Sequence, residues 1–260
     1  MIDPLLRAAC AMMIAAAALP AAAQELDYPA IANGLAIPDG SPAVQRASVP
    51  ASGRSVVVDA ESARLFMVED GQIVDSMRVI VGKPGNATPV LKSTLYYATL
   101  NPYWNVPTEL GRTLIAPNVL KLGMSYLREK GYEVISSYAE NPRILDPESV
   151  DWQAVAAGQE KVFVRQRPGP ANSMGRMKFG FKNDKGIFLH DTPKKELFAE
   201  AARNVSLGCV RLEDADRLAR WLFGREPPQS GIAEMHVPLP RPVPIVITYL
   251  DEGSDLAALR

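Results

Sequence analysis

Cysteine and histidine are scarce in this sequence, with 2 residues of each type among 260. Two cysteines cannot build the disulfide framework of a small secreted scaffold. The histidines, His190 and His236, and the later cysteine, Cys209, lack the short spacing of a zinc motif, so a zinc hydrolase is a distant rival interpretation. We therefore expect neither a metal nor a cofactor.

An excess of one charge is also missing, since 28 basic residues face 29 acidic residues for a net charge of -1. This balance gives no reason to expect nucleic acid or an anionic membrane as a partner. The hydrophobic content of 47% and charged content of 22% are those of an ordinary globular protein. The length allows one large domain or two small ones.

Long hydrophobic runs are absent except near the N-terminus. Residues 1–23 contain Arg7, an apolar run over 8–19 and the small residues 21–23, which together predict a cleaved signal peptide. A helix over 8–19 would be about 18 Å long at ~1.5 Å per residue, short of a hydrocarbon core of ~30 Å. We expect export to the periplasm or cell envelope, with an uncleaved anchor as the alternative.

Prolines and glycines mark residues 24–53 as a linker or arm. The C-terminal residues 251–260 are expected to form a tail. Cys10 lies within the signal segment, so Cys209 becomes the last cysteine after cleavage. A single thiol in an oxidising compartment indicates a reactive residue, although a buried cysteine that packs as a small hydrophobe is the common alternative.

The stretch from 187 to 224 brings this thiol near a histidine. The apolar run 187–190 predicts a buried strand that ends in His190, and Ser206-Leu-Gly208 predicts a tight turn before Cys209. Helical spacing of apolar residues over 215–223, opened by acidic residues and closed by Gly224, predicts a helix. We expect Cys209 just before that helix, where its dipole would favour a thiolate.

The remaining segments read mainly as strands. Asp70-Gly71 between apolar runs indicates a hairpin, and strands are predicted over the ranges 55–58, 64–68, 73–81, 93–100, 161–166, 176–181 and 245–249. Prolines at 102 and 107 argue against regular pairing of the block 101–107. Helices are predicted near 118–130 and 147–157. This pattern predicts a mostly antiparallel β fold.

Three ordered blocks carry a resemblance to a known family. They comprise 101–107, 165–179, and a signature made of His190-Asp191-Thr192-Pro193, Arg203, Ser206 and Gly208-Cys209-Val210-Arg211. The chain from 54 to 249 thereby resembles the L,D-transpeptidases with a YkuD-type catalytic domain, in particular their YcbB-like branch. The resemblance implies a mainly β catalytic domain over 54–250, a YkuD-type β-sandwich with short helices and an inserted helical capping segment over about 108–158.

The residues themselves suggest how such a site works. Cys209 is the candidate nucleophile and His190 its base. Backbone N–H groups of Gly208 and Cys209 could receive an oxyanion. Arg211 could bind a carboxylate, with a structural salt bridge as the alternative. The resemblance adds that the backbone carbonyl of Asp191 orients the histidine ring. We expect the Asp191 carboxylate to hold the turn.

Weaker candidates for lining the substrate groove are Ser206, Asn172, Trp104 and Tyr103, with Trp104 equally explained as plain core. The resemblance implies peptidoglycan stem peptides as substrate. A Cys209 thioester would release D-alanine and pass the acyl group to an amine, giving a 3→3 cross-link, and carbapenems would inhibit covalently.

Other readings remain open. Many relatives carry histidine at the position of Leu207, so this chain could instead be an L,D-carboxypeptidase or an enzyme that detaches proteins from the wall. A wall-attached protein is a further candidate acceptor. An inactive wall-binding module is an alternative of a different class.

Overall fold

The computed structural model describes residues 52–250. The predicted signal peptide, the linker up to residue 51 and the tail over 251–260 lie outside the described residues. Within 52–250 no helix is long and apolar enough to cross a bilayer.

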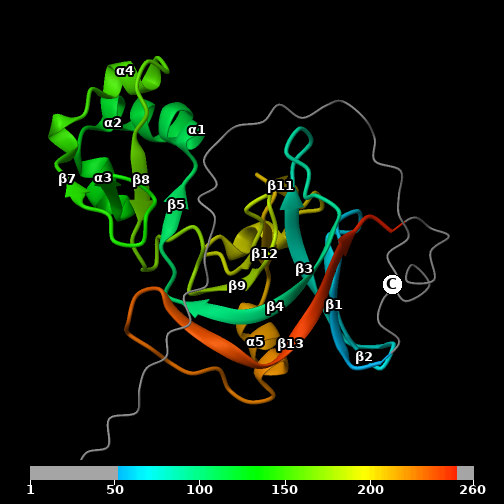
Figure 1. Ribbon diagram of the computed structural model, residues 1–260. Coiled ribbons are helices and arrows are strands. Elements are labelled where there is room, and N and C mark those ends of the chain that lie inside the picture. The colour runs from blue at the N-terminus through cyan, green and yellow to red at the C-terminus, as the bar shows by residue number, and fades with distance from the viewer. Residues whose placement is uncertain (1–51, 251–260) are drawn as a thin grey trace, which may run out of the picture. The chain divides into compact units, whose positions relative to one another are not determined.

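A nine-stranded sheet organises most of the described chain (Figure 1). Its strands, in spatial order, are β11 (Asn204–Ser206), β3 (Gln72–Gly82), β12 (Val210–Leu212), β10 (Leu189–His190), β9 (Met177–Phe181), β4 (Leu91–Leu100), β13 (Met235–Thr248), β1 (Arg54–Asp59) and β2 (Arg64–Glu69). Most pairs are antiparallel, whereas β1–β13, β10–β12 and β3–β11 are parallel. The mainly β prediction is confirmed.

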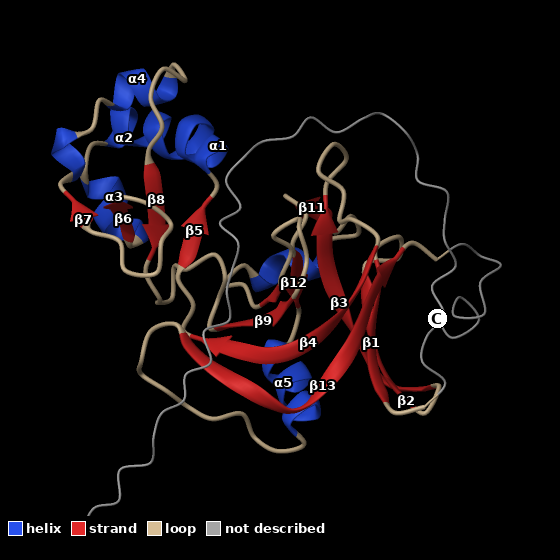
Figure 2. Cartoon of the chain, in the orientation of Figure 1, coloured by secondary structure: helices blue, strands red, loops and turns tan. Residues whose placement is uncertain are grey.

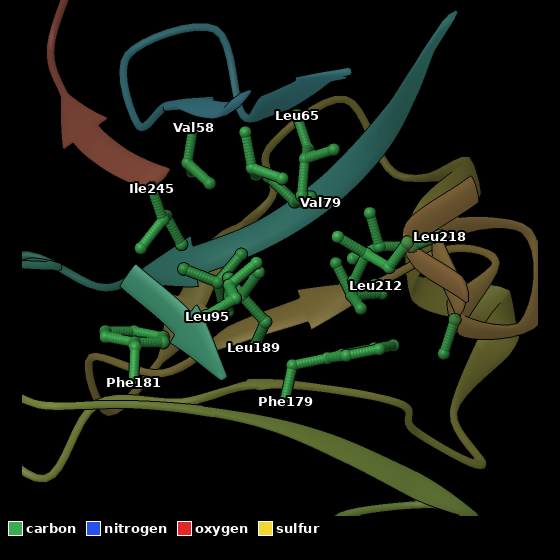
Figure 3. Packing of buried hydrophobic residues seen from close by; sticks show 14 of the residues in the cluster. Val58, Leu65, Val79, Leu95, Phe179, Phe181, Leu189, Leu212, Leu218 and Ile245 are labelled. Atoms are coloured by element: carbon green, nitrogen blue, oxygen red, sulfur yellow. The ribbon is translucent and has the colours of Figure 1, made fainter. Parts of the chain in front are cut away.

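The predicted hairpin joins β2 to β3. Asp70 and Gly71 both have positive φ, 49° and 77°, as the tight connection of two twisted strands requires. Because β2 also pairs with β1, the β2–β3 pairing joins the last strand of the order to the second one. The sheet is therefore continuous around one large hydrophobic cluster (Figure 3), which includes Val58, Leu95 and Phe179.

Helix α5 (Ala215–Phe223) packs on this cluster (Figure 2). The Asp214 side chain caps it by accepting a hydrogen bond from Arg217 N, and Gly224 ends it with φ 65°. Its five buried residues are the apolar positions that the sequence predicts, namely Ala215, Leu218, Ala219, Leu222 and Phe223. This helix prediction is confirmed in position and in buried face.

A second, four-stranded sheet lies between β4 and β9 in the chain, in the order β5 (Trp104–Val106), β8 (Phe163–Gln166), β6 (Tyr132–Ile135), β7 (Ile144–Leu145). Its helices are α1 (Thr108–Leu110), the π-helix Gly111–Ile115, α2 (Ala116–Leu122), α3 (Ser125–Lys130), the 3-10 helix Pro147–Ser149 and α4 (Trp152–Ala156). Sheet and helices share their own hydrophobic cluster.

Three expectations for this region were wrong. The prolines at 102 and 107 flank β5 without preventing it, because neither lies among the residues that pair with β8. The single helix over 118–130 is two helices, since Gly123 adopts φ 77° between them. The strands β6 and β7 were missed, because each is too short to show a period of its own.

Strand β13 is longer than the predicted 245–249. It pairs with β1 only from Ile245 onward, so its earlier residues have β4 on one side and no strand on the other among the described residues. Proline is tolerated on such an edge because the missing N–H costs no ladder hydrogen bond. The prolines at 238, 240, 242 and 244 therefore fit within the strand.

Candidate active site

Two neighbouring parallel strands bring the histidine and the cysteine together. Leu189 of β10 lies opposite Val210 of β12, and His190 lies opposite Arg211. Leu189 and Val210 are fully buried in the large cluster. Because successive strand residues point to opposite faces, His190, Arg211 and Cys209 lie on the face away from that cluster. One face of two strands thus carries the predicted nucleophile, base and cation.

The same row continues across the sheet. His190 lies opposite Lys178 of β9, Lys178 opposite Thr99 of β4, and Thr99 opposite His236 of β13. We call Arg211, His190, Lys178, Thr99 and His236 the outer row. His236 Nδ1 contacts Thr99 Oγ1 at 2.9 Å. This second histidine lies three strands away from His190, and its Nδ1 has a hydrogen-bond partner, as expected for a structural residue.

His190 is 4% exposed, and its Nδ1 lies 2.5 Å from the backbone oxygen of Asp191. A carbonyl oxygen can only accept, so Nδ1 carries the proton and Nε2 of the neutral ring is left as an acceptor. Burial lowers the pKa of His190 to about 4; the Asp191 carbonyl opposes this shift, while Arg211 and Lys178 add to it. The imidazole is therefore neutral at pH 7.

The Asp191 carboxylate is engaged in the adjoining turn. It accepts hydrogen bonds from Arg176 N at 2.9 Å and from Lys195 Nζ at 2.7 Å. Gly175 passes so close that an added Cβ would lie 2.3 Å from Asp191 Oδ2. The side chain of Asp191 thus holds the backbone of this turn, while its main-chain oxygen contacts the His190 ring.

Residues 206–209 form a tight turn, which we call the nucleophile turn. Ser206 Oγ donates to Cys209 O at 2.6 Å and accepts from Gly208 N at 3.1 Å. The N–H of Gly208 is therefore occupied, which contradicts its expected role as an oxyanion donor. Ser206 is equally occupied, and its expected role in substrate binding is wrong for the same reason. Cys209 N–H, by contrast, has no acceptor among the described residues.

Cys209 is half-buried, with Sγ 3.8 Å from Gly186 O. Burial raises the pKa of the thiol, although a backbone hydrogen bond at Phe188 and the charge of Arg211 oppose the rise. The expected thiolate at a helix start is wrong, because β12 separates Cys209 from α5. No hydrogen bond joins Sγ to the His190 ring in the described chain. The resting pair is a neutral thiol and a neutral imidazole.

Arg211 has no carboxylate within ion-pair distance among residues 52–250, and its buried Nε has no hydrogen-bond partner there. Burial lowers the pKa of the guanidinium, and Cys209 opposes this shift. The alternative of a structural salt bridge is therefore contradicted. A cation in this state is suited to receive an anionic ligand beside Cys209.

Comparison with known proteins agrees with this geometry. Residues 53–243 match the YkuD family, described as the L,D-transpeptidase catalytic domain. This chain belongs to that family. A Haemophilus influenzae protein named as a candidate L,D-transpeptidase is 33% identical over 175 residues, 67% of this chain and 35% of that protein. The chain thus spans about a third of this relative's length.

Two solved structures are also similar. A Mycobacterium smegmatis L,D-transpeptidase shows 15% identity with a TM-score of 0.35 over 76% of this chain and 59% of that one. A Mycobacterium tuberculosis L,D-transpeptidase 3 with a faropenem-derived adduct shows 12% identity and a TM-score of 0.34 over 75% and 60%. Membership in the YkuD family rests on the family match and the curated relative. The YcbB-like branch stays a prediction.

Two weaker candidates in this YkuD domain have other roles. Asn172 is buried, and its amide bonds to the backbone of Pro102, Arg167 and Met174, so it cannot line a groove. Trp104 packs on the cluster of the smaller sheet, as its alternative reading held. The expected substrate role of Asn172 is contradicted, whereas that of Trp104, which is only partly buried, stays a prediction.

Tyr103 stays a prediction as a groove residue. Its backbone N donates to Glu234 at 2.5 Å, and the Arg165 guanidinium lies 4.1 Å from its ring centre. The covering role of 108–158 is likewise a prediction, since no hydrogen bond or ion pair joins that segment to Cys209 or His190 within the described chain.

Sequence reasoning missed the role of Lys178 beside His190. Lys178 pairs with Glu234 at 2.7 Å and lowers the pKa of His190. Strand periodicity could have placed it on the outer face, but only the pairing register sets it opposite the histidine. Among residues 52–250 no three histidine, cysteine or acidic side chains gather as a metal site.

Proposed function

We propose that this YkuD domain is an exported cysteine L,D-transpeptidase acting on tetrapeptide stems of peptidoglycan. The observation that carries the proposal is the shared outer face of β10 and β12 with Cys209, His190 and Arg211. A thiol, a neutral imidazole with a free Nε2 and an unpaired guanidinium supply a nucleophile, a base and a carboxylate-binding group.

Acylation begins with a proton transfer. His190 Nε2 takes the proton of the Cys209 thiol as sulfur attacks the carbonyl carbon of the third stem residue. The C–S bond forms and the carbonyl electron pair moves to oxygen. Collapse of this oxyanion breaks the C–N bond, and D-alanine leaves with the proton from His190. Because both groups are neutral at rest, His190 acts as a general base, with a contact that closes when substrate binds.

The second half-reaction releases the acyl group. An amine of a second stem attacks the thioester, His190 takes its proton, and the thiol regains that proton as the C–S bond breaks. The product is a 3→3 cross-link, or a linkage to a wall-attached protein when that supplies the amine. Neither a metal nor a cofactor takes part.

Hydrolysis is the second candidate. Leu207 lies in the nucleophile turn with 46% of its surface exposed, and its side chain cannot accept a proton from an incoming amine. Water could then resolve the thioester, giving an L,D-carboxypeptidase or an enzyme that detaches wall proteins. The inactive wall-binding module is disfavoured because Cys209, His190 and Arg211 share one face.

Mass spectrometry of the purified protein incubated with disaccharide-tetrapeptide tests the proposal. A cross-linked dimer with free D-alanine is expected, tripeptide with free D-alanine and no dimer would show the hydrolase, and unchanged substrate would contradict both. Cys209→Ala should form no acyl adduct with a carbapenem, whereas Ser93→Ala, at an exposed hydroxyl bonded to Lys182 O, should acylate normally. A full adduct on Cys209→Ala would remove the nucleophile from the mechanism.

A further inference from the structure

The loop between β3 and β4 folds back against the nucleophile turn. Lys83 N donates to Ser206 O at 2.9 Å, at the start of that turn. Gly82 lies so close to the loop that an added Cβ would be 2.1 Å from Asn86 O and 2.6 Å from Thr88 N. The loop is therefore held against the end of β3, and through it against residues 206–209.

Thr88 makes the second contact, at the end of the turn. It is 1% exposed, and its Oγ1 accepts from Gly82 N at 2.9 Å. The same hydroxyl lies 2.8 Å from Gly208 O. Since a carbonyl can only accept, the single hydroxyl proton points at Gly208. Tyr249 OH donates to Thr88 O at 2.8 Å and holds the loop from its other side.

The carbonyl of Gly208 and the N–H of Cys209 belong to one peptide unit. That unit is planar and trans, so the two groups point in opposite directions. With Gly208 O bonded to buried Thr88, Cys209 N–H points away from Thr88. Within the described chain it has no acceptor. Gly208 has φ 116°, a conformation that side chains rarely adopt, so this orientation depends on glycine and on the bond that holds it.

We infer that Thr88 is a positioning residue: by binding Gly208 O it aims Cys209 N–H at the oxyanion that forms when Cys209 attacks a substrate carbonyl. The inference rests on the proposed acyl transfer and names the donor that replaces the occupied N–H of Gly208. A hydrogen bond to a carbonyl also polarises its amide, which makes the N–H a stronger donor. No catalytic atom of Thr88 touches the substrate.

Two reactions of the Cys209 thiol distinguish a role of Thr88 in positioning the oxyanion donor from a general effect on the structure of the site. Acylation by a carbapenem passes through an oxyanion, whereas alkylation by iodoacetamide displaces iodide at a saturated carbon and forms none. Thr88→Val keeps the shape and removes the hydroxyl. We expect acylation to slow by roughly 10–100-fold, part of the 10²–10³ that a whole oxyanion donor contributes. Alkylation and its pH profile should be unchanged, and Thr88→Ser should restore acylation.

Tyr249→Phe is the matched control, since it removes a hydroxyl bonded to the same loop and leaves Thr88 Oγ1 in place; it should acylate like the wild type. If circular dichroism shows that Thr88→Val does not fold, the test uses Thr88→Ala, which removes the same hydroxyl. Equal acylation of Thr88→Val and wild type, or a parallel loss of acylation and alkylation, would overturn the inference. A wild type that is never acylated would instead defeat the proposed function.

Discussion

Two polar regions of this domain look alike in sequence and differ in structure. Around Asn172, every polar atom of the amide is used: Nδ2 donates to Pro102 O and Arg167 O at 2.9 Å, and Oδ1 accepts from Met174 N at 2.7 Å. Beside the nucleophile turn, the buried Nε of Arg211 and the N–H of Cys209 have no acceptor among residues 52–250.

The two regions therefore differ in unused hydrogen-bonding capacity and not in polarity; unpaired buried atoms also occur elsewhere, at Ser55, Arg203 and Arg217, but only Arg211 lies beside the thiol. Buried polar groups are nearly always satisfied, because an unpaired one costs about 1–3 kcal/mol. Two unpaired donors next to a thiol therefore call for a ligand that supplies acceptors. A carboxylate and an oxyanion are such acceptors. Four changes test this contrast.

Replacing His190 should have the largest effect. His190→Gln removes the base on the strand that pairs directly with β12 and should slow acylation by about 10²–10⁴-fold, the usual share of general acid–base catalysis. His236→Gln is the matched control in the same outer row and should retain activity, since His236 bonds Thr99. The acylation rates of both variants and of the wild type are measured by mass spectrometry. Equal losses in both variants would contradict the assignment of the base.

The pH dependence of stability should report the buried imidazole. The pKa of His190 is lowered to about 4 from an unfolded value of 6.5, so the folded state binds fewer protons between these values. Stability is complete above pH 6.5 and lost as pH falls toward 4, by about 3 kcal/mol at ~1.36 kcal/mol per pKa unit. Urea unfolding at several pH values should show this slope. If His190→Gln showed the same dependence of stability on pH as the wild type, a group other than His190 would be responsible for it.

The saturated region should respond in stability and not in chemistry. Asn172→Ala leaves buried carbonyls unpaired and should lower the free energy of unfolding by about 1–3 kcal/mol. Under conditions where the variant stays folded, its acylation rate should equal that of the wild type. Paired denaturation curves and acylation rates measure both. If Asn172→Ala had normal stability but a lower acylation rate, Asn172 would again be a candidate for binding substrate.

The smallest effect is expected at Arg211. Arg211→Lys keeps the charge that helps the thiol and loses the planar fork that binds a carboxylate through two bonds. We expect KM for the tetrapeptide to rise about tenfold, the size of a loss near 1.4 kcal/mol, with a nearly unchanged iodoacetamide rate. Arg217→Lys, in a half-buried ion pair with Asp75 of β3, is the control. An unchanged KM would deny Arg211 a binding role.

Local chemistry made much of the fold predictable. Asp214, Gly224 and the apolar spacing between them specify α5 without any distant partner, and Asp70-Gly71 specifies its hairpin in the same way. The strand β13 and the smaller sheet were not predictable to this degree. Proline signals a break unless a strand edge is open, and that opening depends on which strand lies alongside.

The candidate site likewise has parts that were predictable from local sequence and parts that were not. Local sequence patterns and the family resemblance predicted Cys209, His190 and Arg211, and the structure places all three on one face. Residue types could not reveal that Asn172 was already bonded, because its partners include Pro102, which lies 70 positions away. The bond from Gly208 N–H to Ser206 is local, but it depends on the conformation of the turn. Residue types also could not show Thr88, which is 120 positions from Gly208 and belongs to no recognisable motif.

The sequence by itself determined the β class, the last helix of the domain and the three side chains proposed for the chemistry, because each depends on residue chemistry or on neighbours within a few positions. Tertiary structure alone decided the ionisation of those groups and the donor that remains free. Burial and long-range hydrogen bonds set both, by removing water from His190 and Cys209 and by bonding one side of the Gly208–Cys209 peptide.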